Sequence, residues 1–305
     1  MTADALTRID PPDFEARRPD IAALEDIARG TNGHDALGDG AWRDLAHPGA
    51  DSVGFLVEGR SYVHVARSDG SDPSSWTAGI IRIPGEQDDA AITKPLEAAV
   101  AHVAEHGGRL LTCWVFGATD ADDAPFAAAG FQPARSLFEM RAPLPVAGAP
   151  NFPTGITIRT FEPGRDDADW LAVNNRAFRD HAEQGGWQES TLRARIAEPW
   201  FDPTLFLLAF DRAGLAGFNW LKPHAAQAPD PAMGEIYVIG VDPRAQGTGL
   251  GRALAIAGLQ AVHERGFSVA MLFVAGDNTG AIALYRSLGY ETHRTDRAYV
   301  CQVPA

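Results

Sequence analysis

IGVDPRAQGTGLGR, residues 239–252, joins a predicted strand to a predicted helix through a glycine-rich turn. Glycine lets the main chain adopt a positive φ and lets a ligand approach it closely. Amide groups at the start of a helix have no intrahelical partner, and the helix dipole favours negative charge there. The segment therefore predicts a site for phosphate or pyrophosphate oxygens. A turn of this kind can also serve only to pack a helix on a sheet, and the spacing of Gly247, Gly249 and Gly251 alone does not separate the two roles.

Strands and helices alternate around this segment. A β-rich run at 235–241 precedes the turn, and a predicted Ala/Leu helix follows at 249–265. A buried strand at 269–274, a shorter helix at 277–287 and a closing strand after residue 289 complete the block. This alternation is typical of an α/β unit in which helices pack on a sheet.

The first half of the chain repeats this order at an offset of 159 residues. Without gaps, Gly117 aligns with Gly276, and Gly130-Phe131 aligns with Gly289-Tyr290. A proline- and glycine-rich segment, RAPLPVAGAPNFPTG, separates the two copies. Such composition is typical of an extended connector. We predict an N-terminal domain at 1–140, a linker at 141–155 and a C-terminal domain at 156–305.

The second copy resembles the GNAT acetyltransferase superfamily. The resemblance rests on the pattern V-x-P-x-x-[QR]-x-x-G-[LIV]-G-x-x-L at 241–254, then Asp277-Asn278, then ALYRSLGY at 283–290. It implies two tandem α/β (α+β) domains, each a mixed, mostly antiparallel sheet flanked by helices, and acetyl-CoA as cosubstrate. It also implies these cofactor-binding residues: Ile239, Gly240, Val241, Gln246, Gly247, Thr248, Gly249, Leu250, Gly251, Arg252, Asn278, Thr279, Gly280, Ala281, Ile282 and Ala283.

Acetyl transfer to an amine requires a base and an acid, because an ammonium group cannot attack a thioester and the leaving thiolate needs a proton. Glu235, at the start of the strand that leads into the loop, fits the base. Tyr285, in the helix after the next strand, fits the acid. The alternatives are a solvated strand-end glutamate and a tyrosine that only packs on the core.

The first copy lacks these groups. At the same offset Trp76 replaces Glu235, Phe126 replaces Tyr285, and Asp88-Asp89-Ala90-Ala91-Ile92 replaces the glycine turn. Two carboxylates would repel a pyrophosphate. We therefore expect one catalytic domain and one silent domain, and the sequence leaves open whether the silent domain still holds acetyl-CoA.

The second half also resembles the mycothiol synthase family of tandem GNAT enzymes. The matching segments are Asn174-Asn175-Arg176-Ala177-Phe178, HAEQGGW at 181–187, WFDP at 200–203 and FNWLK at 218–222. The resemblance implies acetylation of the cysteinyl amine of desacetylmycothiol, a cysteine joined to glucosamine and inositol. The match is much weaker over residues 1–140.

By this resemblance Asp39, Glu183, Lys222 and Glu235 contact the substrate. For Asp39, a role as a helix cap is an equal alternative. Glu183 could instead be a solvated loop residue, and Lys222 could instead be a surface lysine. Phe273 occupies the position of a substrate-binding tyrosine of the family. Loss of one neutral hydrogen bond costs about 0.5–1.5 kcal/mol, so we expect weaker substrate affinity and an unchanged reaction.

The composition excludes several other classes. The formal net charge is −14, from 26 basic and 40 acidic residues, which argues against nucleic-acid or anionic-membrane partners. The sequence shows no signal peptide and no apolar run long enough to span a bilayer, so we expect a cytoplasmic protein. Cys113 and Cys301 are predicted to be buried thiols. His102 and His106 lack a third ligand at metal spacing, so we expect a solvated helix face and no metal.

Three hypotheses remain at this stage. The first is direct acetyl transfer to desacetylmycothiol by a monomer. The second is a GNAT enzyme for another amine, such as an aminoglycoside or a protein N-terminus. The third is an acyl-CoA sensor without catalysis, which the presence of both Glu235 and Tyr285 disfavours.

Overall fold

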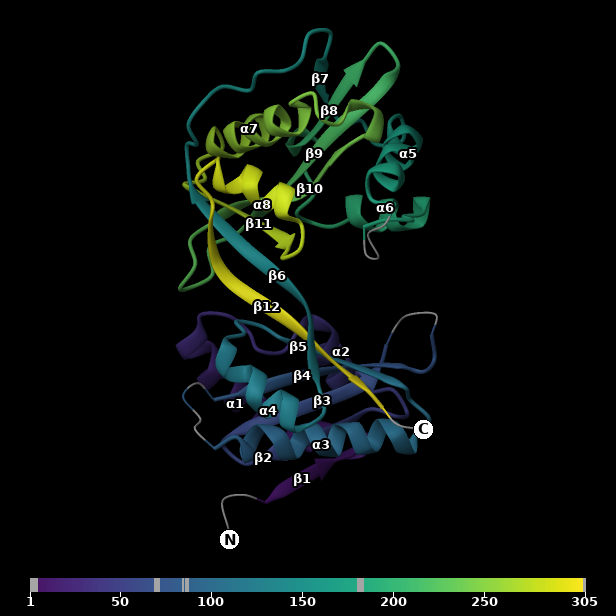
Figure 1. The fold of residues 1–305 in the computed structure, drawn as a ribbon, viewed down its shortest axis with the longest axis vertical. Helices are drawn as coiled ribbons and strands as arrows, with labels where there is room; N and C mark the ends of the chain where they lie inside the picture. Colours follow the sequence, from purple (N-terminus) through teal and green to yellow (C-terminus); the bar gives the residue numbers. More distant parts are fainter. Residues whose placement is uncertain (1–4, 69–71, 84, 86–87, 180–183, 304–305) are drawn as a thin grey trace. The chain divides into compact units, whose positions relative to one another are not determined.

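The chain folds into two compact units, each of which contains strands and helices (Figure 1). The computed structural model describes residues 5–68, 72–83, 85, 88–179 and 184–303. Unit 1 comprises Met1–Phe138, Ala275–Asp277 and Arg294–Ala305. Unit 2 comprises Glu139–Val274 and Asn278–His293. Among the described helices, none has both the length and the apolar character needed to cross a bilayer.

The element order of the first half recurs in the second half. The first half contains β1 (Leu6–Ile9), α1 (Phe14–Asn32), α2 (Asp39–Ala46), β2 (Val53–Val57), β3 (Ser61–Arg67), β4 (Ser75–Arg82), α3 (Ala90–Glu105), β5 (Leu110–Val115), α4 (Asp123–Ala128) and β6 (Gln132–Pro143). The second half contains β7 (Thr157–Thr160), α5 (Asp167–Ala177), α6 (Glu189–Ile196), β8 (Phe206–Asp211), β9 (Gly214–His224), β10 (Met233–Val241), α7 (Leu250–His263), β11 (Val269–Ala275), α8 (Thr279–Arg286) and β12 (Glu291–Gln302). Both β11 and β12 begin 159 residues after their counterparts β5 and β6, as the sequence repeat predicts.

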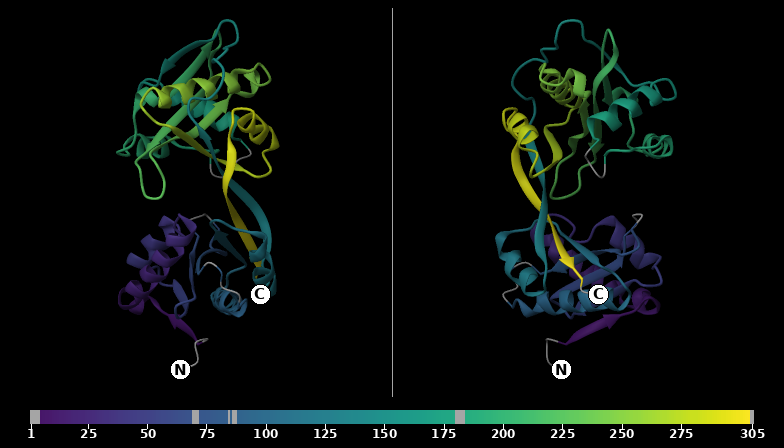
Figure 2. Two further views of the ribbon diagram at one scale, coloured as in Figure 1. Left: turned by 90° about the vertical axis from the view of Figure 1, so that its left-hand side faces the viewer. Right: turned by 45° about the vertical axis from the view of Figure 1, so that its right-hand side comes forward.

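The two halves exchange their closing strands. Residues Arg297–Gln302 of β12 pair antiparallel with Leu110–Val115 of β5, inside unit 1. The strand β6 lies between β12 and β11 in the sheet order, and its end from Glu139 onward belongs to unit 2. Figure 2 shows the yellow end of the chain joining the blue strands of the first half.

The boundaries of the two units differ from the predicted domain boundaries at 140 and 156. Residues after 293 group with unit 1, and residues 139–155 group with unit 2. The physical reason is that β6 and β12 are equivalent strands of a duplicated fold, so each fits the free edge beside either β5 or β11. Alternation of side chains along a strand shows that it is half buried and does not identify its neighbour.

Each sheet has an apolar cluster on both faces. In unit 1, Phe55 of β2 packs with α3 on one face, and the next residue, Leu56, packs with α1 on the other. In unit 2, Trp170 of α5 packs with Trp220 of β9 on one face, and Leu254 of α7 packs on the other. The helices therefore cover both faces, as predicted for α/β units.

One histidine departs from its predicted environment. We expected His102 and His106 on a solvated face of α3, which is wrong for His102, because only 3% of its surface is exposed. Its ring lies against Phe55 and Trp76. Helical spacing placed the two histidines on one face but did not show that a sheet covers part of that face.

A hydrogen-bonded chain is buried between β3 and α2 in unit 1. Nε2 of His64 lies 2.8 Å from Asp44, and Nδ1 lies 3.0 Å from the Tyr62 hydroxyl. A carboxylate only accepts, so Nε2 donates to Asp44 and Nδ1 accepts from Tyr62. The fully buried Tyr62 ring passes so close to Gly54 that a Cβ there would lie 2.6 Å from the hydroxyl oxygen.

Gly54→Ala is therefore expected to destabilise unit 1 by about 1–3 kcal/mol, because a buried tyrosine tied to His64 cannot move aside freely. Chemical denaturation measures the change. Gly30→Ala is the matched control, since a Cβ on this α1 residue meets no atom within 4 Å. It should be neutral or stabilise by about 0.5–1 kcal/mol. Equal unfolding midpoints for the two variants would contradict this packing argument.

Candidate functional site

The strand β10 leaves one of its edges open in the second half of its length. Its antiparallel pairing with β9 continues from Met233 to Val241. Its parallel pairing with β11 covers only Met233–Ile236, although both strands run on beyond that point. Within the described residues, the main chain of 237–241 has no strand partner on the β11 side. An extended ligand with amide groups could pair with this edge.

A β-bulge lies where the two strands part. The register of β10 against β9 shifts between Ile236 and Val238, so Tyr237 is the additional residue. Glu235 faces Lys222 across the strands, and after the bulge Val238 faces Trp220. Both pairs therefore point to the face covered by α5, where the aromatic cluster of unit 2 lies. Bulges commonly redirect side chains in this way beside functional sites.

The glycine-rich turn follows β10 directly. Gly247 has φ +74° and Gly249 has φ +88°, and a Cβ at either position would meet no atom within 4 Å. These glycines are thus needed for backbone conformation, and the space beside them is open. The first α7 amide with a helical partner is that of Ala253, which donates to the Gly249 carbonyl. The amides of 250–252 have no partner within the described residues, so they suit an anion.

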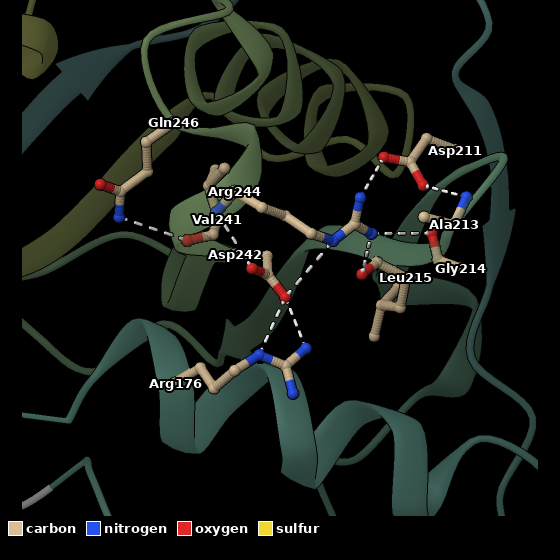
Figure 3. Close-up of polar contacts among 9 residues, drawn as sticks. All are labelled: Arg176, Asp211, Ala213, Gly214, Leu215, Val241, Asp242, Arg244 and Gln246. Atoms are coloured by element: carbon tan, nitrogen blue, oxygen red, sulfur yellow. Dashed lines mark hydrogen bonds and ion pairs between the residues drawn. The ribbon is translucent and has the colours of Figure 1, made fainter.

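An ionic network of Arg176, Asp242, Arg244 and Asp211 holds the start of the turn in place (Figure 3). The buried Asp242 accepts from the Arg176 guanidinium of α5 and from the Arg244 amide. The Arg244 side chain reaches the β8–β9 hairpin, where it pairs with Asp211 and donates to the Leu215 carbonyl at 3.0 Å. Arg244 is therefore committed to positioning the loop. Burial alone would raise the pKa of Asp242, but the hydrogen bonds from Arg176 and the Arg244 amide lower it overall.

Arg252 and Thr248 also make intramolecular bonds. Arg252 donates to the Ser287 hydroxyl at the end of α8, and the Thr248 hydroxyl donates to the Ala245 carbonyl at 2.7 Å. The Gln246 side chain donates to the Val241 carbonyl at 3.4 Å. The loop therefore holds its open shape by its own contacts.

The Glu235 side chain is buried, with 8% exposed, and accepts from Nε2 of His224 at 2.7 Å. The His224 side chain is 30% exposed and lies at the end of β9. A solvated strand-end glutamate, the alternative raised above, does not fit this burial. His224 is not among the residues predicted from the sequence, where its only signal is its place two residues after Lys222, on the same strand face.

Aromatic rings hold the Lys222 ammonium group. Nζ lies 5.0 Å from the centre of the Trp200 ring and 5.6 Å from that of Tyr237. The two rings form an aromatic wall, in which they contact each other edge to face at 5.1 Å, and Lys222 faces Glu235 across the strands. A cation between two aromatic faces is stabilised by their quadrupoles. Lys222 is thus ordered next to the buried carboxylate.

Tyr285 is buried in α8, with 7% exposed. Burial raises its pKa to about 12. Its ring lies 5.7 Å from that of Tyr290, whose buried hydroxyl has no hydrogen-bond partner within the described residues. The Asn278 side chain accepts from the Ala281 amide and so caps α8.

The predicted substrate residues are dispersed. Asp39 is an exposed first-turn residue of α2 in unit 1, and Gly38 is the N-cap residue. Phe273 is 40% exposed on β11, just beyond the last residue paired with β10. Glu183 lies outside the described residues. Asn174 and Asn175 hold the segment that follows it, because their side-chain amides donate to the carbonyls of Gln184 and Trp187.

Unit 1 lacks the equivalent features. Trp76 and Phe126 are fully buried where unit 2 has Glu235 and Tyr285. The Asp88 carboxylate accepts from the Ala90 amide at 3.0 Å and pairs with Arg60. A carboxylate therefore occupies the helix start at which unit 2 presents free amides.

Comparisons with known proteins agree with this geometry. Residues 170–290 match the model of the Acetyltransferase (GNAT) family. A mycothiol acetyltransferase of Thermobispora bispora is 40% identical over 304 residues, covering 98% of this chain and 99% of the relative. The mycothiol acetyltransferase of Streptomyces coelicolor is 37% identical, covering 92% and 89%. This chain belongs to the mycothiol acetyltransferase family.

Solved structures confirm the predicted fold class of this family member. A GCN5-related N-acetyltransferase from Sphaerobacter thermophilus superposes with a TM-score of 0.73 at 20% identity, covering 100% of this chain and 97% of that one. A tandem GNAT protein from the clavulanic acid biosynthesis pathway superposes with a TM-score of 0.68 at 17% identity, covering 99% of both chains. The predicted enzyme class, an N-acetyltransferase, is also confirmed by the family.

Asp242 links the stability of this site to pH. Because its pKa is lowered in the folded state, its contribution is fully present above the ordinary aspartate pKa of about 3.9 and is lost as pH falls through the lower folded value. Asp242→Asn should therefore cost more stability at pH 7 than at pH 3, measured by urea unfolding. Asp277→Asn, at an exposed position, is the control. A cost for Asp242→Asn that does not vary with pH would contradict the assignment.

Proposed function

We propose that this protein transfers the acetyl group of acetyl-CoA to the cysteinyl amine of desacetylmycothiol, giving mycothiol and CoA. The observation that carries the proposal is the buried Glu235, held at the point where β10 leaves β11 and enters the open glycine turn. The names of the relatives that match along most of their length support the substrate. The geometry of unit 2 supports the reaction type.

The residues around the turn fit a CoA molecule. The free amides of 250–252 and the α7 dipole suit the pyrophosphate, and the open edge of 239–241 suits the amide groups of the pantetheine arm. We propose the turn and the start of α8 as the binding segments, with the sixteen residues implied by the family resemblance as contacts. The Asn278 side chain serves there as a helix cap, so its contribution is to place the α8 backbone.

Glu235 fits the role of general base. Its carboxylate is shielded from solvent but touches His224, whose side chain reaches solvent. We propose that Glu235 accepts a proton from the substrate ammonium. His224 then exchanges to its Nδ1–H tautomer through solvent, so that Nε2 takes the proton from Glu235 and Nδ1 releases one proton to solvent. In the balanced reaction the N–C bond forms and the C–S bond breaks. The nitrogen loses two protons, the sulfur gains one, and one proton is released.

Tyr285 fits the role of general acid. With its pKa raised to about 12 by burial, the hydroxyl is protonated at neutral pH. It can therefore hydrogen-bond to the sulfur as the C–S bond breaks and stabilise the developing thiolate. Full transfer from this phenol to a thiolate whose thiol has a pKa near 8.5 is uphill, so it is completed only as the tyrosine is reprotonated. The Tyr285 hydroxyl then recovers its proton from solvent.

Lys222 and its aromatic wall suit a polyhydroxyl ligand. Trp200 and Tyr237 hold the ammonium group in place, so its N–H donors can be shared with sugar hydroxyls at little further entropic cost. Phe273 provides an exposed apolar ring without a hydroxyl. Asp39 and Glu183 remain predicted substrate contacts.

The direct test is an assay of CoA release with acetyl-CoA and desacetylmycothiol, alongside an aminoglycoside and an N-terminal peptide. Glu235→Gln and Tyr285→Phe should each lower kcat by about 10²–10⁴-fold with little change in acetyl-CoA affinity. Tyr290→Phe is a matched control, since its buried hydroxyl has no partner. Turnover of the aminoglycoside or the peptide without turnover of desacetylmycothiol would overturn the proposed substrate. Full activity of both variants would overturn the assigned roles of Glu235 and Tyr285.

The His224 relay has a separate signature. His224→Ala should lower kcat by about tenfold or more, and added imidazole should restore part of the loss, because a free imidazole can accept the proton from Glu235. His263→Ala, on exposed α7 surface, should have no effect. Unchanged kcat, or a loss that imidazole does not relieve, would contradict a relay and leave only a positioning role.

A further inference from the structure

Three metal-ligating side chains meet at the C-terminal end of α3 in unit 1. His102, Glu105 and His106 each offer one ligand atom, and these atoms lie within 4.8 Å of one another. The spacing i, i+3, i+4 places them on one side of the helix. The expectation that no third ligand stands beside the two histidines is therefore wrong: Glu105 supplies it.

Main-chain hydrogen bonds determine which nitrogens are free. Nε2 of His102 donates to the Asp51 carbonyl at 2.8 Å, and Nδ1 of His106 donates to the His102 carbonyl at 2.8 Å. A carbonyl only accepts, so in the neutral rings the lone pairs lie on Nδ1 of His102 and Nε2 of His106. Metal-bound histidines are held in this manner, with the second nitrogen bonded to a carbonyl.

Nδ1 of His102 is a buried polar atom without a partner. The residue is 3% exposed, and within the described residues nothing bonds this nitrogen. A buried acceptor left unpaired destabilises the folded chain, so a bound group that accepts this lone pair would be stabilising.

The surroundings hold the rings together. The His102 and His106 rings lie 4.1 Å apart, and the Trp76 ring meets both of them edge to face at 5.6 and 6.1 Å. Glu105 is exposed, so its side chain can rotate to close the remaining distance. The nearby Asp51 carboxylate adds negative charge, although Arg67 pairs with it at 2.6 Å.

We propose that His102, Glu105 and His106 bind a divalent transition-metal ion, with Zn²⁺ the best match. Two imidazoles and one carboxylate form a donor set that Zn²⁺ favours, and water would complete a tetrahedron. The ion would join the end of α3 to the segment before β2, through the His102 bond to Asp51. At the offset of 159 residues the second copy has Ala261, Glu264 and Arg265, so unit 2 cannot form the same site.

The test uses the full chain without a histidine tag, treated with chelator and titrated with zinc sulfate by calorimetry. Cobalt chloride, followed by its visible absorption, reports the donor geometry. We expect one saturable Zn²⁺ per chain and a Tm that rises with zinc concentration, because binding to the folded state stabilises it. His106→Ala and Glu105→Gln should each weaken binding by about tenfold or more and reduce the Tm shift.

His263→Ala is the matched control, since this histidine lies in the last turn of the equivalent helix α7 and should leave zinc affinity unchanged. Absence of saturable binding would overturn the proposal and leave a water as the partner of Nδ1 of His102. Zinc affinity equal to that of the unaltered chain in both Glu105→Gln and His106→Ala would also overturn it. If His106→Ala fails to fold, Glu105→Gln decides the question alone, because Glu105 is exposed and makes no fold-critical contact in the described structure.

Discussion

The parting of β10 from β11 is the constraint on which unit 2 depends. A strand in the middle of a sheet normally satisfies its main chain on both sides. Here β9 pairs with β10 along its whole length, while β11 leaves after Ile236. This arrangement keeps β10 rigid and opens one edge to a ligand. The bulge at Tyr237 at the same level points Glu235 and the aromatic wall to one face, and the α7 amides lie at the end of the same strand. The buried Glu235 carboxylate, the open strand edge and the free α7 amides are thus consecutive features of one strand and its turn.

The duplicated unit has the same architecture with different residues at the positions of the site. Unit 1 has the same order of strands and helices, including a parallel pair, β4 and β5, that corresponds to β10 and β11. Trp76 and Phe126 stand at the positions of Glu235 and Tyr285 and contribute apolar packing to the core. Asp88 satisfies the start of α3 with its own carboxylate. At these positions unit 1 therefore has internal contacts where unit 2 has a buried carboxylate and free main-chain amides.

Local patterns predicted the elements well, and side-chain partners poorly. The turn at 239–252, the repeat and the helices after each turn all follow from spacing and glycine placement, which act over a few residues. The role of Arg244 did not follow, because its partner Asp211 is 33 residues away on a hairpin. His224 was overlooked for a similar reason: its importance arises only when β9 pairs with β10. His102 appeared solvated because helical spacing does not show which side of a helix is covered.

By itself, the sequence determined the duplicated α/β fold, the glycine turn and the family, since these depend on residue types at short, regular spacings. Tertiary structure alone decided which closing strand completes which unit, because β6 and β12 are equivalent and either edge can accept either strand. It also decided that Glu235 is buried against His224, that Lys222 lies between aromatic rings, and that three ligands meet on α3. Each of these depends on distances between segments remote in the chain, and packing rather than local propensity sets those distances.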